Sequence, residues 1–117
     1  MRDRAAEKWA EPKFAEAAQR GKALFEGKAG CAGCHPGPYF TDKQTHNVGI
    51  TSPNEPNAFY DTPSLVEAYR TAPYYHDGRA ATMRDALTKH DGGGLHGKLS
   101  KLIPSEIDDL IAYVLSL

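Results

Sequence analysis

Two cysteines lie three positions apart, with a histidine directly after the second: Cys31-Ala32-Gly33-Cys34-His35. They are the only cysteines in the 117-residue chain. A disulfide across this spacing would close a very small loop and restrain the unfolded chain little. A thioredoxin-like redox pair needs a βαβ context, and no strand is predicted before Cys31. Zinc needs four ligands, and the other histidines show no closely spaced second pair.

The pattern C-x-x-C-H is instead typical of covalent c-type haem attachment. Each thiol adds to one of two vinyl groups on the porphyrin, and His35 then coordinates the iron from one face. The other ring nitrogen of His35 needs an acceptor that fixes its tautomer, and we expect a backbone carbonyl from residues 36–40. Tyr39 and Phe40 are expected to wall the haem edge, with ordinary loop packing as the alternative.

The flanking segments must form helices that position this motif. Apolar residues at spacings of three and four predict one helix over residues 13–26 and another over 104–117. Gly21 lies on the apolar stripe of the first helix, which indicates that another helix or a flat group approaches closely there. Two shorter helices are predicted, from Thr62 to about Tyr69 and from Thr82 to just before the glycines at 92–94. No alternating pattern predicts a strand.

These elements predict an all-α domain of about four helices with long loops packed around one haem. Such a domain buries too few side chains unless a cofactor fills its centre. By length the chain is one domain, with residues 13–117 as its body and residues 1–12 as an extension or linker. The net charge of −1 argues against a nucleic-acid partner, and no apolar stretch is long enough to predict a membrane span.

Three segments between residues 62 and 83 keep the spacing of a known family: Thr62-Pro63-Ser64-Leu65, then TAPYYHDG from Thr71 to Gly78, then Ala81-Thr82-Met83. With the C-x-x-C-H motif, they make residues 14–117 resemble the C-terminal haem domain of the bacterial di-haem cytochrome c peroxidase family. The resemblance implies a cytochrome c-like fold and one covalent haem c. It also places the protein in the periplasm or beyond, where such haem is attached.

The second face of the iron has five candidate ligands in the sequence: Met83, His46, His76, His90 and His96. The resemblance implies His90, which stands where the family usually has its methionine ligand. It places Met83 on a leucine position of the family, so Met83 is the second choice, and His96 is the third.

The resemblance implies roles in haem binding for further residues. It puts Tyr74 and His76 near the haem, and His46 beside it in a loop. Val66 stands where the family often has arginine, so Arg70 and Arg79 are the candidate contacts to the haem propionates, since a guanidinium suits a carboxylate.

A complete di-haem enzyme carries two C-x-x-C-H motifs, whereas this sequence has one. We therefore expect a mono-haem c-type cytochrome that transfers single electrons, with two histidine ligands and a low potential. Its partner would be a redox protein or an adjacent redox domain, and the sequence indicates no oligomeric state. The alternative is a peroxidase-like or sensor haem domain with a displaceable sixth ligand.

Overall fold

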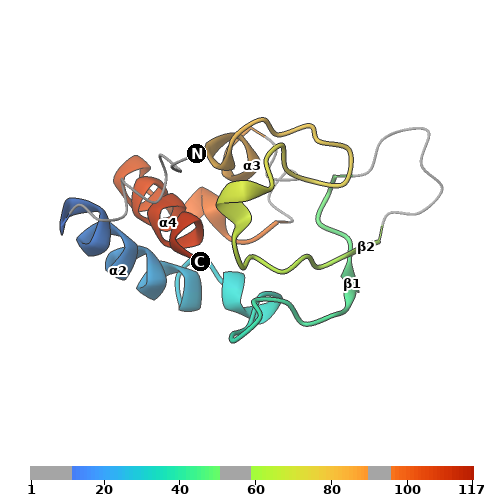
Figure 1. Ribbon diagram of the computed structural model, residues 1–117, viewed down its shortest axis with the longest axis horizontal. Helices are drawn as coiled ribbons and strands as arrows, with labels where there is room; N and C mark the ends of the chain where they lie inside the picture. The colour runs from blue at the N-terminus through green and yellow to red at the C-terminus, as the bar shows by residue number, and fades with distance from the viewer. Residues whose placement is uncertain (1–11, 51–58, 90–95) are drawn as a thin grey trace.

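The computed structural model describes residues 12–50, 59–89 and 96–117. Its α-helices are α2 (Pro12–Glu26), α3 (Met83–Leu87) and α4 (Pro104–Ser116). Short 3₁₀ turns lie at η1 (Cys31–Gly33), η2 (Ala68–Arg70) and η4 (Leu99–Lys101). Strands β1 (Thr45–His46) and β2 (Tyr60–Asp61) pair antiparallel, with His46 opposite Tyr60. Helices α2 and α4 lie side by side at one end of the molecule, and the strand pair lies at the other (Figure 1).

Helices α2 and α4 cross where Gly21 faces α4. A Cβ atom added to Gly21 would overlap the backbone carbonyl of Asp109 and lie 2.8 Å from the Cβ of Tyr113. Only glycine therefore allows this close approach, which confirms the prediction made from its place on the apolar stripe. Two ion pairs flank the crossing, Arg20 with Asp109 at 2.9 Å and Lys28 with Glu106 at 2.8 Å.

The helix ends follow local rules. Thr82 caps α3, since its hydroxyl accepts a hydrogen bond from the backbone N–H of Asp85 at 3.1 Å. Pro104 occupies the first turn of α4, where its missing N–H costs nothing. Glu106 accepts a hydrogen bond from the backbone N–H of Ile103 at 3.0 Å, which holds the entry to the helix.

Three of the four predicted helices are present, and the prediction for residues 62–69 is wrong. Only the 3₁₀ turn η2 forms at its end, because Glu67 has a left-handed backbone with φ of 59°. The hydroxyl of Ser64 donates instead to the carbonyl of Tyr39 at 2.6 Å, which ties this segment to the loop after the cysteines. The structure also contains the two-residue strands β1 and β2, which the sequence pattern does not predict. The fold is therefore mostly helical with a small sheet.

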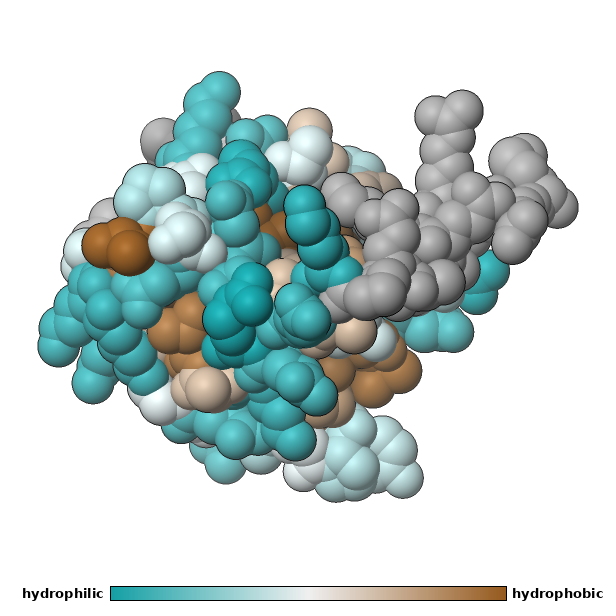
Figure 2. Space-filling model, turned by 90° about the vertical axis from the view of Figure 1, so that its left-hand side faces the viewer, coloured by the Kyte–Doolittle hydropathy of each residue, from teal (hydrophilic) through white to brown (hydrophobic). Residues whose placement is uncertain are grey.

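The core lies where α2 and α4 meet the chain around η1. Phe25 and Leu110 are its most buried large side chains. The ring of Tyr113 packs edge-on against Phe25 with centroids 5.1 Å apart, and Phe40 meets Phe25 in the same way at 6.0 Å. The outer face of this end is mostly hydrophilic, with separate hydrophobic patches (Figure 2).

Within the described residues, no helix is both long and apolar enough to cross a membrane.

Candidate functional site

The two thiols and the histidine are brought together by one tight turn. Gly30 has φ of 70°, a left-handed conformation that glycine adopts easily, and it starts the 3₁₀ turn η1. The backbone N–H groups of Cys34 and His35 both donate to the carbonyl of Cys31, at 3.3 and 3.0 Å. The two cysteines are unpaired thiols. The turn therefore presents Cys31, Cys34 and His35 to the same cavity.

His35 is buried, with 8% of its surface exposed. Its Nδ1 lies 2.9 Å from the carbonyl oxygen of Phe40. Because a carbonyl only accepts hydrogen bonds, Nδ1 carries the proton and Nε2 carries the lone pair. The acceptor falls within residues 36–40, as expected from the sequence. Burial lowers the pKa of His35, while hydrogen bonding to the carbonyls of Phe40 and Pro63 opposes that shift.

Burial also sets the state of the thiols. It raises the pKa of Cys31 to about 11. The pKa of Cys34 is raised as well, first by burial and then by the negative charge of Asp42. Both groups are therefore protonated thiols at neutral pH, which is the form that adds as a whole S–H across a vinyl double bond.

A cavity of about 600 Å³ opens beside the turn. Its size suits a large organic ligand, for which pockets of roughly 300–1,000 Å³ are usual. Its walls are mainly apolar and come from every part of the described fold, including Phe25, Ile50, Leu65, Leu87, Leu110 and Val114. Two thiols, an oriented imidazole and an apolar cavity of this size form a donor set that fits a covalently attached haem.

Several residues predicted for the site line this cavity, namely Cys31, Cys34, His35, His46, Tyr74, His76, Met83 and His96. Tyr39 is 67% exposed, and Phe40 packs against Phe25 and Tyr113. Neither of these two lines the cavity, although the backbone of Phe40 serves His35. His90, the predicted sixth ligand, lies outside the described residues.

The two arginines expected at the propionates also lie away from the cavity wall. Arg70 is exposed and pairs with Glu67 at 3.7 Å. Arg79 forms a chelate with Asp77, whose carboxylate accepts bonds from the guanidinium at 2.7 and 3.0 Å. That guanidinium also holds the pKa of Asp77 well below its usual range. The described cavity lining contains no lysine or arginine.

Sequence reasoning missed the role of Tyr75. Its hydroxyl lies 2.6 Å from the carbonyl of Ala86 and 2.8 Å from Nδ1 of His96. The hydroxyl donates to the carbonyl, so Nδ1 of His96 is the donor in the second bond and Nε2 carries the lone pair. Tyr75 thus orients His96 as Phe40 orients His35. No signal in the sequence links positions 75 and 96, which are far apart in the chain.

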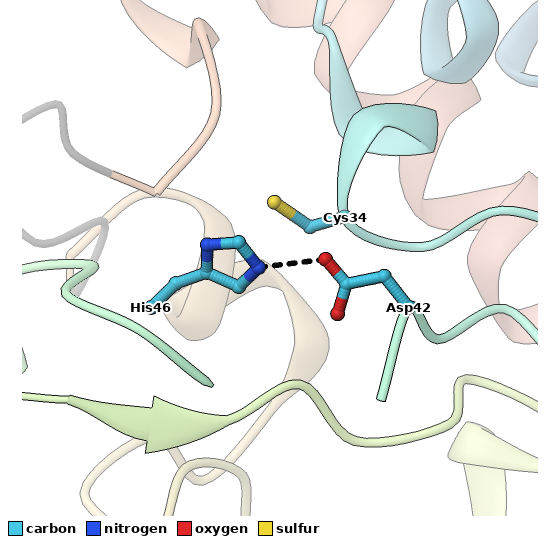
Figure 3. A group of neighbouring side chains, drawn as sticks. All are labelled: Cys34, Asp42 and His46. Carbon is cyan, nitrogen blue, oxygen red and sulfur yellow. Dashed lines mark hydrogen bonds and ion pairs between the residues drawn. The ribbon is translucent and has the colours of Figure 1, made fainter. Parts of the chain in front are cut away.

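A second group of neighbouring side chains consists of Cys34, Asp42 and His46 (Figure 3). Cys34 and His46 also line the cavity. Nε2 of His46 is 2.7 Å from Oδ2 of Asp42, and Sγ of Cys34 lies close to both. The pKa of Asp42 is lowered, first by the backbone N–H of Gln44 and then by His46. Each of the three residues could offer one ligand atom to a metal ion. The Cys34 sulfur, however, is the atom that the C-x-x-C-H motif uses for haem attachment. The pair His46–Asp42 is therefore better described as a polar contact beside the thioether position.

The cytochrome c family model matches residues 18–117. Among curated proteins, cytochrome-c peroxidase IdrP1 of Denitromonas iodatirespirans is 31% identical, the match covering 83% of this chain and 39% of that protein. Methylamine utilization protein MauG of Methylorubrum extorquens is 37% identical, with 66% of this chain and 26% of that protein covered.

A solved structure of a MauG-like protein associated with microbial copper homeostasis matches the fold with a TM-score of 0.69. It is 24% identical, and the match covers 98% of this chain and 51% of the other. With respect to the two curated relatives, IdrP1 and MauG, this chain spans less than half of their length.

Proposed function

We propose that this chain, which belongs to the cytochrome c family, is a mono-haem electron-transfer domain whose iron is held between two histidines. Its relatives confirm the resemblance to the haem domain of the cytochrome c peroxidases, and the family identifies the cofactor as covalently bound haem c. The single observation that carries the proposal is the buried His35, oriented by Phe40 beside two thiols that line an apolar cavity.

In this proposal Cys31 and Cys34 would hold the haem through thioether bonds, and His35 would be one ligand to its iron. The haem supplies an iron that changes oxidation state by one electron. The chain keeps Nε2 of His35 directed by the Nδ1 bond and excludes water with the apolar wall. Held in this way, the ligands move little between oxidation states, which suits rapid electron exchange.

For the second axial ligand we propose His90, on the strength of its position in the family pattern. Met83 and His96 are the other candidates, and both line the cavity. Met83 is the second choice, at the start of α3, while Nδ1 of His96 is held by Tyr75. Two histidine ligands would lower the potential, whereas methionine would raise it.

We propose further that residues 13–117 form the haem domain, with residues 1–12 as an extension or linker. Its partner would be a redox protein or an adjacent redox domain. We place the protein in the periplasm or beyond, because that is where haem c is attached in bacteria.

A second candidate function is a peroxidase-like or sensor haem domain with a displaceable sixth ligand. The relatives named as peroxidases favour it, as does His46, which lines the cavity, is bonded to Asp42 and could exchange a proton there. Such chemistry needs an open iron position, so coordination decides between the two functions.

Carbon monoxide tests the proposal, because it binds ferrous iron only at an open or readily vacated position. We expect the reduced protein to keep its six-coordinate spectrum under carbon monoxide and to show no turnover of hydrogen peroxide. Rapid carbon monoxide binding together with peroxide turnover would support the peroxidase-like function. A sixth ligand lost on reduction, with no peroxide turnover, would support the sensor.

A further inference from the structure

One buried polar atom has no partner among the described residues: the hydroxyl of Tyr60. Tyr60 lies on β2, opposite His46 on β1, and its side chain lines the cavity. Its ring stacks on the imidazole of His76, with centroids 4.0 Å apart and planes 14° from parallel. The strand pair and the stack together fix where this hydroxyl lies.

An unsatisfied buried hydroxyl is costly. Leaving a buried donor without an acceptor forfeits the hydrogen bond that it makes to water in the unfolded chain, and native structures contain few such groups. The other two tyrosines of the cavity wall already use their protons, since Tyr74 donates to Ala68 at 2.9 Å and Tyr75 donates to Ala86. Among the tyrosines of the described lining, Tyr60 is therefore the one whose hydroxyl has no hydrogen-bond acceptor. A group that fills the cavity could supply that acceptor.

Haem c offers only one kind of strong acceptor at its periphery, the two propionate carboxylates. The described cavity wall provides no lysine or arginine for them, and Arg70 and Arg79 pair with acidic side chains elsewhere. Tyr60 belongs to the strand pair, which lies at the end of the molecule away from helices α2 and α4 (Figure 1). We propose that the Tyr60 hydroxyl donates a hydrogen bond to a haem propionate, with His76 holding the phenol ring in place. This inference rests on the proposed haem site.

Such a bond has two measurable consequences. A donor stabilises the ionised carboxylate and so lowers its pKa. It also partly neutralises a negative charge near the iron, which favours the ferrous form. Removing the hydroxyl should therefore raise the propionate pKa and lower the reduction potential wherever the propionate is ionised.

The variant Tyr60→Phe removes the hydroxyl and keeps the ring for the stack. Tyr39→Phe is the matched control, because it removes the hydroxyl of an exposed tyrosine that does not line the cavity. The reduction potential of the purified holoprotein is measured from pH 4 to 9 by spectroelectrochemistry. His46, His76 and Asp61 neighbour Tyr60, and Asp42 binds His46; these ionisable groups are present in all three proteins. The difference between Tyr60→Phe and Tyr39→Phe therefore isolates the Tyr60 hydroxyl.

In Tyr60→Phe, we expect the pH range over which the reduction potential changes to shift to higher pH by about one unit. This shift corresponds to a tenfold change in the ionisation constant of the propionate. At pH values above that range the reduction potential of Tyr60→Phe should be lower than that of the wild type, while Tyr39→Phe should match the wild type. An unchanged profile would overturn the inference and leave an ordered water as the partner of Tyr60. A change of iron spin state in Tyr60→Phe would overturn it as well, because the hydroxyl would then act at the iron.

A measurement on the wild type covers the case in which the variant fails to assemble. Ferric-minus-ferrous infrared difference spectra, with ring-¹³C tyrosine, should show a tyrosine C–O band that shifts with the oxidation state. The absence of any tyrosine band would contradict the proposed bond. A mass spectrum without covalent haem would instead overturn the proposed function itself, so the two failures are distinguishable.

Discussion

The Nδ1 atom of His35 donates to the carbonyl oxygen of Phe40 over 2.9 Å. This bond fixes the tautomer of a buried imidazole and leaves Nε2 as its electron-pair donor. Iron-ligating histidines are held in the same manner by acceptors behind them. The loop thus holds His35 in the tautomer that the proposed iron ligand needs.

Haem attachment at both cysteines is the first prediction. Cys31→Ala and Cys34→Ala should each leave one thioether, because the two thiols act on separate vinyl groups. The double variant should lose its haem under denaturing conditions. Mass spectrometry of the haem peptide and the pyridine haemochrome spectrum check this. Haem that stays covalently bound in the double variant would contradict the assignment.

Gly21 is predicted to limit stability through the α2–α4 crossing. A helix-interior alanine is favoured over glycine by about 1 kcal/mol, but here its Cβ would meet the backbone of Asp109. Overpacking of this kind costs typically 1–3 kcal/mol, so Gly21→Ala should on balance lower the free energy of unfolding, by up to about 2 kcal/mol. Denaturant unfolding of the holoprotein measures it. Gly33→Ala is the control, because an added Cβ there meets nothing within 4 Å. Equal stability of the two variants would refute the steric account.

The sequence was sufficient for the parts of the fold that depend on local pattern. The stripes of residues 13–26 and 104–117 predicted α2 and α4, and the glycine on the first stripe predicted their close contact. The C-x-x-C-H motif predicted the thiols, His35 and its backbone acceptor. These features depend on residues close together in the chain.

Contacts between distant segments could not be predicted in this way. The helix expected at residues 62–69 is replaced because Ser64 bonds to Tyr39, a contact that no local pattern encodes. The stack of Tyr60 on His76 and the bond of Tyr75 to His96 likewise depend on how the loops fold over the cavity. Arg79 looked available for a propionate, but Asp77 two positions earlier binds it.

The hydroxyl of Tyr75 should contribute to stability. Tyr75→Phe removes the bonds that the Tyr75 hydroxyl makes to Ala86 and His96 at the cavity wall. A lost bond at a partly buried site costs about 1 kcal/mol, or more where a partner is left unsatisfied. Tyr39→Phe is the control, since Tyr39 is 67% exposed and should change little. Thermal and denaturant unfolding compare the two, and a Tyr75→Phe variant as stable as Tyr39→Phe would contradict this role.

Glu106 should make the stability depend on acid pH. Its pKa is lowered, first by the hydrogen bond from Lys28 and then by the backbone N–H of Ile103. A carboxyl group whose pKa is lower in the folded state stabilises the fold above its unfolded pKa. That contribution is lost as the pH falls through the folded pKa, below the ordinary value of 4.5.

Glu106→Gln should therefore be less stable than the wild type near neutral pH and approach it in acid. Urea midpoints from pH 7 down to pH 3, followed by circular dichroism, measure the convergence. The variant Lys28→Met should reduce the same pH dependence while keeping the Ile103 bond. Parallel wild-type and Glu106→Gln curves across the whole range would contradict the assignment.

The central claim is a coordinatively closed iron, and low-temperature EPR of the ferric protein tests it most directly. Wild type, His90→Ala, His96→Ala and Met83→Leu are compared, the last chosen to preserve packing at the start of α3. We expect a low-spin signal typical of two histidine ligands in the wild type, becoming high-spin in His90→Ala and unchanged in the other two variants. A wild-type signal that is already high-spin, or one indifferent to His90→Ala, would contradict it.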